Sequence, residues 1–180
     1  METRVTSENE LLARAQRHDR LALAEIYDRY SPGIFRYARR LLGDADLAED
    51  CVADTFQRFL LALRRQRGPR EHLQAYLFRI AHNWVTDHYR REAPVEGLED
   101  ELWPDTSQDP EADAQQHIQQ GALRKAIRQL TPDQQQVILL KYVEDWDNAA
   151  IARAMHKPVG SIKSLQHRAL ARLQSYLEKE

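Results

Sequence analysis

The stretch DNAAIARAMHKPVGSIKSLQHRALARLQ, residues 147–174, decides the fold of the C-terminal part of the chain. Its first half contains Ala149, Ala150 and Ala152, the small side chains that closely crossing helices need. Pro158 then interrupts the pattern, because proline lacks the N–H group that would continue a helix. The second half has one apolar face, made of Ile162, Leu165, Ala169 and Leu173. The stretch therefore predicts a helix-turn-helix.

The second helix of this motif carries polar and basic side chains away from its apolar face. They are Lys163, Ser164, His167 and Arg168. Side chains of these types can contact phosphates and base edges in the major groove of duplex DNA. The same pattern also suits an ordinary helical hairpin whose basic face is simply solvated. These residues alone leave both interpretations open.

The residues before this motif also follow a helical period. Ile127 and Leu130 belong to one predicted helical segment. Thr131 and Pro132 then provide an N-cap and a first-turn proline for the next helix. The block 119–180 is therefore predicted to be helical throughout.

The N-terminal block, residues 1–91, shows helical periodicity and no sustained alternation of polar and apolar residues. Ser31 and Pro32 predict the N-cap and first turn of a new helix, and Gly43 predicts its end. Further along, Gly68 is expected to end another helix before a basic loop.

Basic and aromatic side chains are interleaved in the segment AYLFRIAHNWVTDHYRR, residues 75–91. Its polar face carries Arg79, Asn83, Asp87, Arg90 and Arg91. This combination suits melted DNA, whose bases stack on aromatic rings and whose phosphates attract cations. Trp84 also falls in the apolar stripe with Ile80, so a core position for it is the alternative. His82 and His88 fall on different faces, so no metal site is expected.

Charge is unevenly distributed along the chain. Residues 1–91 carry a net +3, residues 92–118 a net −9 and residues 119–180 a net +4, for a total of −2. The central segment has no Lys or Arg and contains three of the seven prolines. It predicts a flexible acidic linker between two folded units. The expected fold class is therefore all-α, with two small helical-bundle domains, the C-terminal one containing the helix-turn-helix.

Composition argues against several other classes of protein. Hydrophobic residues make up 42% of the 180 positions and charged residues 30%, as expected for a folded protein of amphipathic helices. The single cysteine, Cys51, cannot form an internal disulfide, and its neighbour Asp50 would not activate a thiolate, so a buried structural role is predicted.

No glycine-rich phosphate loop or nucleophile elbow is present, so we expect neither enzymatic activity nor a cofactor. Without a long apolar run or signal core, the chain is expected to be cytoplasmic and not to insert into a membrane.

Three segments together resemble a bacterial extracytoplasmic-function (ECF) sigma factor. They are YDRYSPGIFRYARRLLGDADLAEDCVADTFQRF at residues 27–59, HLQAYLFRIAHNWVTDHYRR at 72–91, and LTPDQQQVILLKYVEDWDNAAIARAMHKPVGSIKSLQHRALARL at 130–173. The resemblance covers roughly residues 8–92 and 119–177. Its specificity is high, because separate blocks match in order and at the spacing of the family.

The resemblance implies a surface for RNA polymerase in the N-terminal block. The segment AEDCVADTFQRF, residues 48–59, is similar to the family helix that binds the clamp helices of the core enzyme. Asp50, Thr55, Phe56 and Phe59 fall on its motif positions. The core enzyme is therefore an expected partner.

The resemblance also implies two modules that read promoter DNA. The loop 64–72 and the helix with Arg79 and Asn83 look like the module that reads and melts the −10 element and holds one flipped base. Asp87, Arg90 and Arg91 lie on the same face and are expected to take part. In the module for the duplex −35 element, Lys163, Ser164, His167 and Arg168 fall on the DNA-facing positions.

Four positions of the helix-turn-helix depart from the pattern of the family. Ala150 replaces a common Glu and His156 a common Gly, while Leu165 and Gln166 stand where Arg and an aliphatic residue are usual. The last pair predicts a change in local packing or in a phosphate contact.

The expected organisation is a promoter −10 and polymerase-binding domain at 1–91, an acidic linker at 92–118 and a −35 domain at 119–180. The linker is expected to run toward the RNA exit path, and an anti-sigma factor is an expected partner from the resemblance. The alternative is a stand-alone helix-turn-helix regulator with an N-terminal sensing or dimerisation domain.

Overall fold

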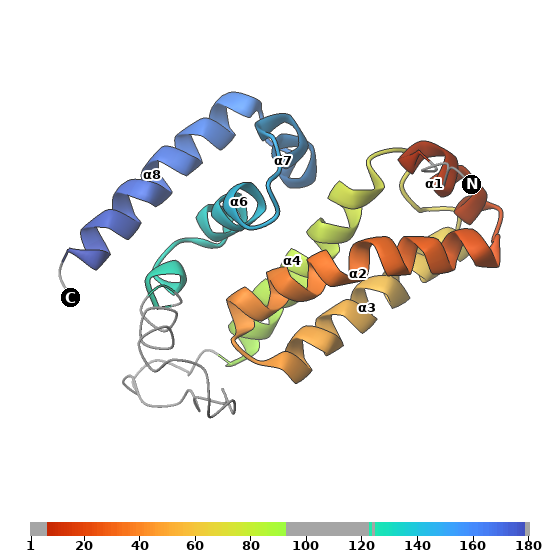
Figure 1. Cartoon of the computed structure of the whole chain (residues 1–180), viewed down its shortest axis with the longest axis horizontal. Coiled ribbons are helices and arrows are strands. Elements are labelled where there is room, and N and C mark those ends of the chain that lie inside the picture. Colours follow the sequence, from red (N-terminus) through yellow and green to blue (C-terminus); the bar gives the residue numbers. More distant parts are fainter. Residues whose placement is uncertain (1–6, 93–122, 124, 179–180) are drawn as a thin grey trace, which may run out of the picture.

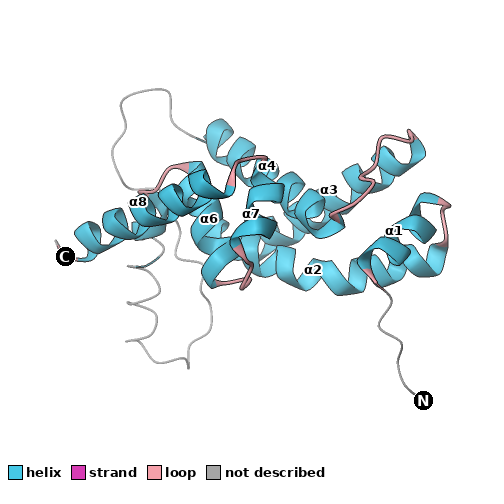
Figure 2. Ribbon diagram, turned by 90° about the horizontal axis from the view of Figure 1, so that it is seen from above, coloured by secondary structure: helices cyan, strands magenta, loops and turns pink. Residues whose placement is uncertain are grey.

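The computed structural model describes residues 7–92, 123 and 125–178. Nearly all of the acidic linker predicted at 92–118 therefore lies outside the described residues. Within the described ranges the regular elements are helices, and Figure 2 shows no strand among them. The predicted all-α fold class is confirmed. In this part of the chain no helix is long and apolar enough to cross a membrane.

The N-terminal unit consists of four helices that pack side by side (Figure 1). They are α1 (Glu8–Gln16), α2 (Arg20–Leu42), α3 (Ala45–Arg64) and α4 (Leu73–Glu92). The first three begin at residues whose side chains accept a backbone N–H of the first turn, namely Ser7, Asp19 and Asp44. Gly43 ends α2 in the left-handed conformation, at φ 78°, which glycine adopts without steric cost.

The predicted helix start at Ser31 is wrong, because α2 continues through Pro32. A proline inside a helix removes one hydrogen bond and costs about 3 kcal/mol. Here Ile26 before the proline and Ile34 after it are fully buried on the same side of the helix. Burying such side chains contributes about 1.5–3 kcal/mol each, which offsets the cost of the proline.

Aromatic side chains fill the middle of the N-terminal unit. Tyr37 of α2, Phe59 of α3 and Phe78 of α4 are almost completely buried. The rings of Tyr37 and Phe78 meet edge to face with centroids 5.6 Å apart, and the ring of Phe59 lies 6.3 Å from that of Tyr76. The core therefore fixes α4 against α2 and α3, and with it the polar face that α4 presents.

The C-terminal unit consists of α6 (Pro132–Tyr142), α7 (Asn148–Met155) and α8 (Val159–Leu177). The predicted cap before α6 is confirmed, because Thr131 and Gln134 form a reciprocal capping box. Asp147 caps α7, which ends at His156 in the left-handed conformation at φ 52°. A turn containing Pro158 leads into α8, so α7 and α8 form the predicted helix-turn-helix.

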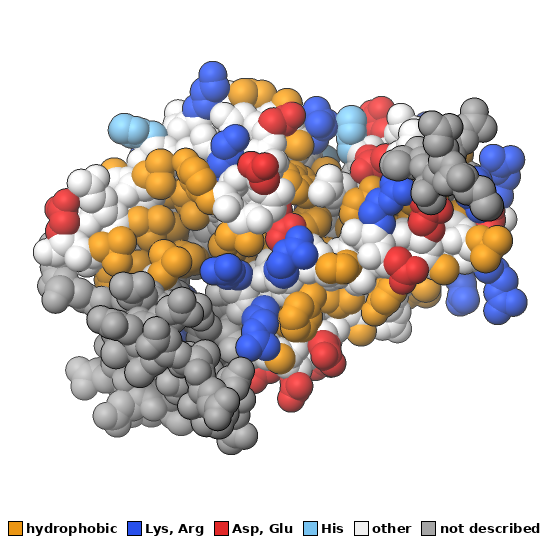
Figure 3. Space-filling model, viewed as in Figure 1, with side chains coloured by type: hydrophobic (Ala, Val, Ile, Leu, Met, Phe, Trp, Pro, Cys, Tyr) orange, Lys and Arg blue, Asp and Glu red, His pale blue; other side chains and the backbone are white. Residues whose placement is uncertain are grey.

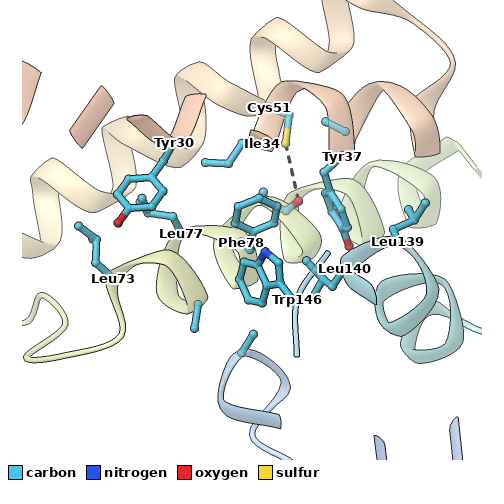
Figure 4. Packing of buried hydrophobic residues seen from close by; sticks show 14 of the residues in the cluster. Tyr30, Ile34, Tyr37, Cys51, Leu73, Leu77, Phe78, Leu139, Leu140 and Trp146 are labelled. Atoms are coloured by element: carbon cyan, nitrogen blue, oxygen red, sulfur yellow. Dashed lines mark hydrogen bonds between the residues drawn. The ribbon is translucent and has the colours of Figure 1, made fainter. Parts of the chain in front are cut away.

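The two units contact each other through α7, which packs on α4, and through the segment between α6 and α7. The indole of Trp146 lies against Phe78 of α4, with ring centroids 4.9 Å apart, and Leu140 lies close by (Figure 4). Trp146 is only 5% exposed. At the edge of this contact Arg36 of α2 donates to Glu144 at 3.0 Å. The buried residues of both units thus form a shared apolar cluster.

Candidate nucleic-acid and polymerase interfaces

Helix α8 presents all four residues predicted to face duplex DNA. Its inner face is buried through Ile162, Leu165 and Ala169. The exposed side chains are Lys163, Ser164, His167 and Arg168. A lysine and an arginine on one exposed helix face can neutralise phosphates, and the histidine and serine can approach base edges.

Two of these side chains also bond to the backbone of their own helix. The hydroxyl of Ser164 donates to the carbonyl of Gly160 at 3.1 Å, and Nε of Arg168 donates to the carbonyl of Ser164 at 3.3 Å. These bonds orient the arginine along the helix and leave its terminal nitrogens able to reach outward. Lys163 and His167 lie one turn apart on the same face.

The departures at Leu165 and Gln166 have a packing explanation. Leu165 is 8% exposed and belongs to the core of the helix-turn-helix. The amide of Gln166 donates to the side-chain oxygen of Asn148 at 2.8 Å, which ties α8 to the first residue of α7. Both residues therefore hold the two helices of the motif together.

A basic surface beside α8 was missed by the sequence analysis. Arg153 of α7 is exposed and lines a shallow hollow at the turn of the motif, next to His156. Lys157 lines the same hollow and forms an ion pair with Asp133 at 3.1 Å. The exposed Arg153 could have been identified as the basic residue opposite the buried face of α7.

The polar face of α4 carries the second predicted set. Asn83, Arg90 and Arg91 are exposed, while Arg79 and Asp87 are half-buried. The guanidinium of Arg79 lies 5.4 Å from the centre of the Tyr76 ring, and Arg90 approaches Asp87 at 3.7 Å. Only Asn83 is both exposed and uncharged, which suits recognition of a base edge.

The alternative interpretation of Trp84 is partly supported. Its indole is half-buried, packs against the apolar cluster and stacks on the imidazole of His88 at 5.4 Å with the rings 3° from parallel. The indole of Trp84 therefore lies at the edge of the core, with part of its surface exposed to solvent. His82 lies on another side of α4, facing Tyr37. In the described ranges no group of three or more His, Cys, Asp or Glu side chains could hold a metal ion.

The imidazole of His82 is held neutral inside the N-terminal unit. Its Nδ1 lies 2.6 Å from the hydroxyl of Tyr37, and its Nε2 lies 3.4 Å from the hydroxyl of Thr86. Burial lowers the pKa of His82 to about 4, and the nearby Asp133 carboxylate acts in the opposite direction. Burial also raises the pKa of Tyr37 well above its usual value.

The loop between α3 and α4 is strongly basic and has an unusual backbone. Its exposed arginines are Arg65, Arg67 and Arg70, and the exposed Arg64 at the end of α3 adjoins them. Gln66 and His72 both adopt φ near 55°, in the left-handed region that side chains other than glycine rarely occupy. Figure 3 shows Lys and Arg side chains around the end of the molecule where α1 and the start of α2 lie.

The predicted polymerase-binding residues of α3 occupy different environments. Asp50 is exposed, but Thr55, Phe56 and Phe59 are buried, with 0%, 7% and 1% of their surface exposed. The aromatic ring of Phe56 packs on Tyr27 of α2, with centroids 4.8 Å apart. These three residues therefore lie under the surface of α3, and a partner could contact little of their side chains directly.

The surface above them is an apolar hollow between α2 and α3. Arg20, Leu23, Ala24, Tyr27, Phe56, Phe59 and Leu60 line it. Leu60, one of the apolar residues in this lining, is 39% exposed. Its exposure, together with that of Leu21 and Leu61, was not identifiable from the helical period alone.

Cys51 has the buried structural role that the sequence predicted. Its thiol is fully buried and donates to the carbonyl of Ala81 at 3.7 Å, joining α3 to α4 (Figure 4). Burial raises the pKa of the Cys51 thiol to about 12, so the thiolate needed for reactivity does not form near neutral pH.

The helix-turn-helix with its exposed cationic face has the arrangement that DNA-binding regulators of transcription use. The family model for Sigma-70 region 2 matches residues 26–94, and that for Sigma-70 region 4 matches residues 120–173. The ECF RNA polymerase sigma factor SigL of Mycobacterium tuberculosis is 31% identical over 86% of this chain and 88% of its own length. The chain belongs to the family of ECF RNA polymerase sigma factors.

Other relatives extend this comparison. The ECF RNA polymerase sigma factor BldN of Streptomyces coelicolor is 32% identical over 91% of this chain, and the match spans 63% of BldN. CnrH, solved in complex with the cytosolic domain of CnrY, has the same fold, with a TM-score of 0.74, 20% identity and coverage of 96% of this chain and 98% of CnrH. RpoE from Bartonella quintana, solved with the anti-sigma factor NepR, has a TM-score of 0.60 at 23% identity, over 86% of this chain and 96% of RpoE. Membership of the family argues against the stand-alone regulator.

Proposed function

We propose that this sigma factor divides promoter recognition between α8 and the α4 face with its preceding basic loop. Helix α8 contacts the duplex −35 element through Lys163, Ser164, His167 and Arg168. The exposed Asn83 reads a flipped base of the melted −10 element, while Arg79, Arg90 and Arg91 attract its phosphates. The observation that carries the proposal is the contrast between an exposed cationic face on α8 and a neutral amide exposed among aromatic side chains on α4.

Core polymerase is proposed to bind over α3 and the hollow that α3 forms with α2. Asp50 and Leu60 are exposed there, and the buried Phe56 and Phe59 form the floor of the hollow. Apolar surface of this kind gains free energy when a partner helix covers it. The protein is proposed to work in the cytoplasm, without catalysis of its own.

We also propose an anti-sigma factor as a partner. The support comes from RpoE of Bartonella quintana, which was solved with the anti-sigma factor NepR. Co-purification of the full chain after expression in a cell that contains such a factor, followed by mass spectrometry, tests this proposal.

The domain boundaries 1–91, 92–118 and 119–180 are proposed from composition and charge. Limited proteolysis is expected to cut first between residues 92 and 117 and to leave two fragments. Recovery of one resistant fragment across that stretch would contradict separate domains.

The two DNA-binding faces can be tested by the kind of contact each makes. Replacing Lys163 or Arg168 with Ala should weaken binding that depends on the −35 element and lower its salt dependence by about one unit of slope for each phosphate that is no longer neutralised. Asn83→Ala should leave that slope unchanged but impair promoter opening, with partial recovery on a template whose −10 region is already melted.

The measurement combines permanganate footprinting with a salt titration, with core polymerase present throughout. Glu178→Gln, an exposed change in the residue that follows α8, is a control that should alter neither readout. Normal opening by Asn83→Ala, together with undiminished binding by Lys163→Ala, would overturn the assignment of both faces.

A further inference from the structure

The start of α4 is capped by a side chain of α1, the first helix of the N-terminal unit. Glu8, the first residue of α1, accepts the backbone N–H of Leu73 at 3.0 Å with one carboxylate oxygen. Its other oxygen accepts the N–H of Gln74 at 3.3 Å and the hydroxyl of Tyr30 at 3.0 Å. One carboxylate thus satisfies the first two N–H groups of α4, where the helix dipole also favours a negative charge.

The residue in the ordinary capping position cannot replace Glu8. His72 precedes α4, and its carbonyl accepts the first helical bond, from Tyr76 at 3.0 Å. An N-cap side chain usually bonds the first turn from an extended backbone, but His72 has φ 55°. Glu8 therefore holds the first turn of α4, where His72 supplies no cap.

The last residue of α1 holds the loop itself. The amide of Gln16 donates to the carbonyl of Pro69 at 2.9 Å, across 53 residues of sequence. Gly68, beside that proline, approaches α3 so closely that an added Cβ would lie 2.7 Å from Leu63. The two ends of α1 thus fix both the middle of the basic loop and the start of the helix after it (Figure 1).

We infer that Glu8 and Gln16 are positioning residues for −10 recognition. They hold the loop with its exposed Arg67 and Arg70 in one orientation relative to Asn83 of α4. A base and its neighbouring phosphates can then meet a single prearranged surface, with less conformational freedom lost on binding. This inference rests on the proposed role of α4 and its preceding loop in −10 recognition.

The test compares base preference at the two promoter elements. Holoenzyme made with the full wild-type chain first selects a promoter from a randomised DNA library. Transcription at 20 °C is then compared between this promoter and templates with one base changed in the −10 or the −35 element. A fraction of unfolded protein lowers the signal on every template equally, so it cancels in each ratio.

Gln16→Ala and Glu8→Gln are expected to lower the −10 preference by about two- to tenfold each, the range expected from the loss of one hydrogen bond. Preference at −35 should stay within about twofold of the wild type. Gln16 is exposed, so its replacement keeps the test available even if Glu8→Gln folds poorly. The matched controls are Asn9→Ala and Glu10→Gln, exposed changes on the same helix that should alter neither ratio.

Two outcomes would overturn the inference. One is an unchanged −10 preference in Gln16→Ala and Glu8→Gln; the other is an equal fall at both elements. Asn83→Ala in the same assay separates this failure from that of the proposed function. If Asn83→Ala lowers the −10 preference and the α1 variants do not, only the positioning role fails. If Asn83→Ala has no effect either, the −10 assignment fails as well.

Discussion

The two units of this sigma factor hold their helices in different ways. In the C-terminal unit, Thr131 caps α6 and Asp147 caps α7, and each side chain bonds a backbone N–H three residues away. The N-terminal unit also caps α1, α2 and α3 locally, but Glu8 caps its α4 from 65 residues away, and Tyr37 bonds His82 across 45. The first turn of α4 therefore depends on a contact between distant parts of the chain, unlike the first turns of α6 and α7.

This difference matters for how each unit meets DNA. A helix-turn-helix needs one exposed helix in a fixed relation to a short neighbour, and local caps with a tight turn provide this. Recognition of melted DNA needs a loop and a helix to form one surface. In the surface proposed for −10 recognition, bonds from α1, more than fifty residues earlier in the sequence, reach both the loop and the start of α4.

The largest effect is expected from Phe78→Ala. Phe78 is 1% exposed and contacts both Tyr37 in its own unit and Trp146 in the segment between α6 and α7. Removing a buried aromatic ring typically costs about 3–5 kcal/mol of the free energy of unfolding. Urea denaturation followed by circular dichroism measures this loss.

Trp146→Ala and the double variant sharpen the comparison of the two units. Because the two rings are in contact, the effects of Phe78→Ala and Trp146→Ala should not add. Additive effects within about 0.5 kcal/mol would mean that the contact between the units contributes nothing in solution.

The next effect is a dependence of stability on pH that originates in the N-terminal unit. His82 has a folded pKa of about 4 against 6.5 for the free side chain, so the unfolded chain binds its proton first as the pH falls. The stability linked to His82 is complete above pH 6.5 and is lost as the pH falls toward 4. The full loss corresponds to about 3 kcal/mol.

Urea denaturation at pH values from 7.5 to 4 tests this dependence. His82→Leu should remove the part of the slope between pH 6.5 and 4, whatever its effect on absolute stability. Gln57→Ala, an exposed change on α3 that removes no ionisable group, should leave the slope unchanged. An identical slope in His82→Leu and the wild type would contradict the assignment.

A smaller loss of stability is expected when the long-range cap of α4 is changed, and a smaller one still when the local cap of α7 is changed. Glu8→Gln should cost about 1.5–3 kcal/mol, because an amide offers one acceptor oxygen where two are needed. Asp147→Asn should change stability by only a few tenths of a kcal/mol, since asparagine caps helices as well as aspartate does. Thermal and urea denaturation of the two variants give the comparison, and equal losses would contradict it.

Among the contacts between the two units, the smallest effect is expected from Arg36→Ala. Arg36 pairs with Glu144 between the two units, and its own side chain is 57% exposed whereas that of Glu144 is only 6% exposed. The expected loss is about 1–2 kcal/mol, between the values for exposed pairs and for fully buried pairs. Arg39→Ala, an exposed arginine one turn later in α2, is the control. A loss above 2 kcal/mol relative to that control would show that the ion pair dominates the contact.

Much of this protein was predictable from local sequence. The helix-turn-helix, the N-cap at Thr131 and the end of α2 at Gly43 are confirmed. The cap and the helix end depend on residues within about four positions of one another, and the helix-turn-helix depends on apolar spacing within each of two adjacent helices. The exposure of Lys163 and His167 follows from the same helical period.

The sequence could not decide which residues of α3 lie at the surface. Thr55, Phe56 and Phe59 occupy positions that the family motif marks for polymerase binding, yet they are buried. Helical spacing shows that they share a face with the core, but the edge of that face is set by how far α2 extends over it. Leu60 is exposed for the same reason.

By itself, the sequence determined the all-α class, the helix-turn-helix and the exposed face of α8, because hydrogen bonds and apolar spacing within a few residues encode them. Tertiary structure alone decided that α2 passes through Pro32, that Trp146 packs on Phe78 and that Glu8 caps α4. These features depend on the free energy of contacts between residues far apart in the chain. No local pattern records which distant side chain will supply such a contact.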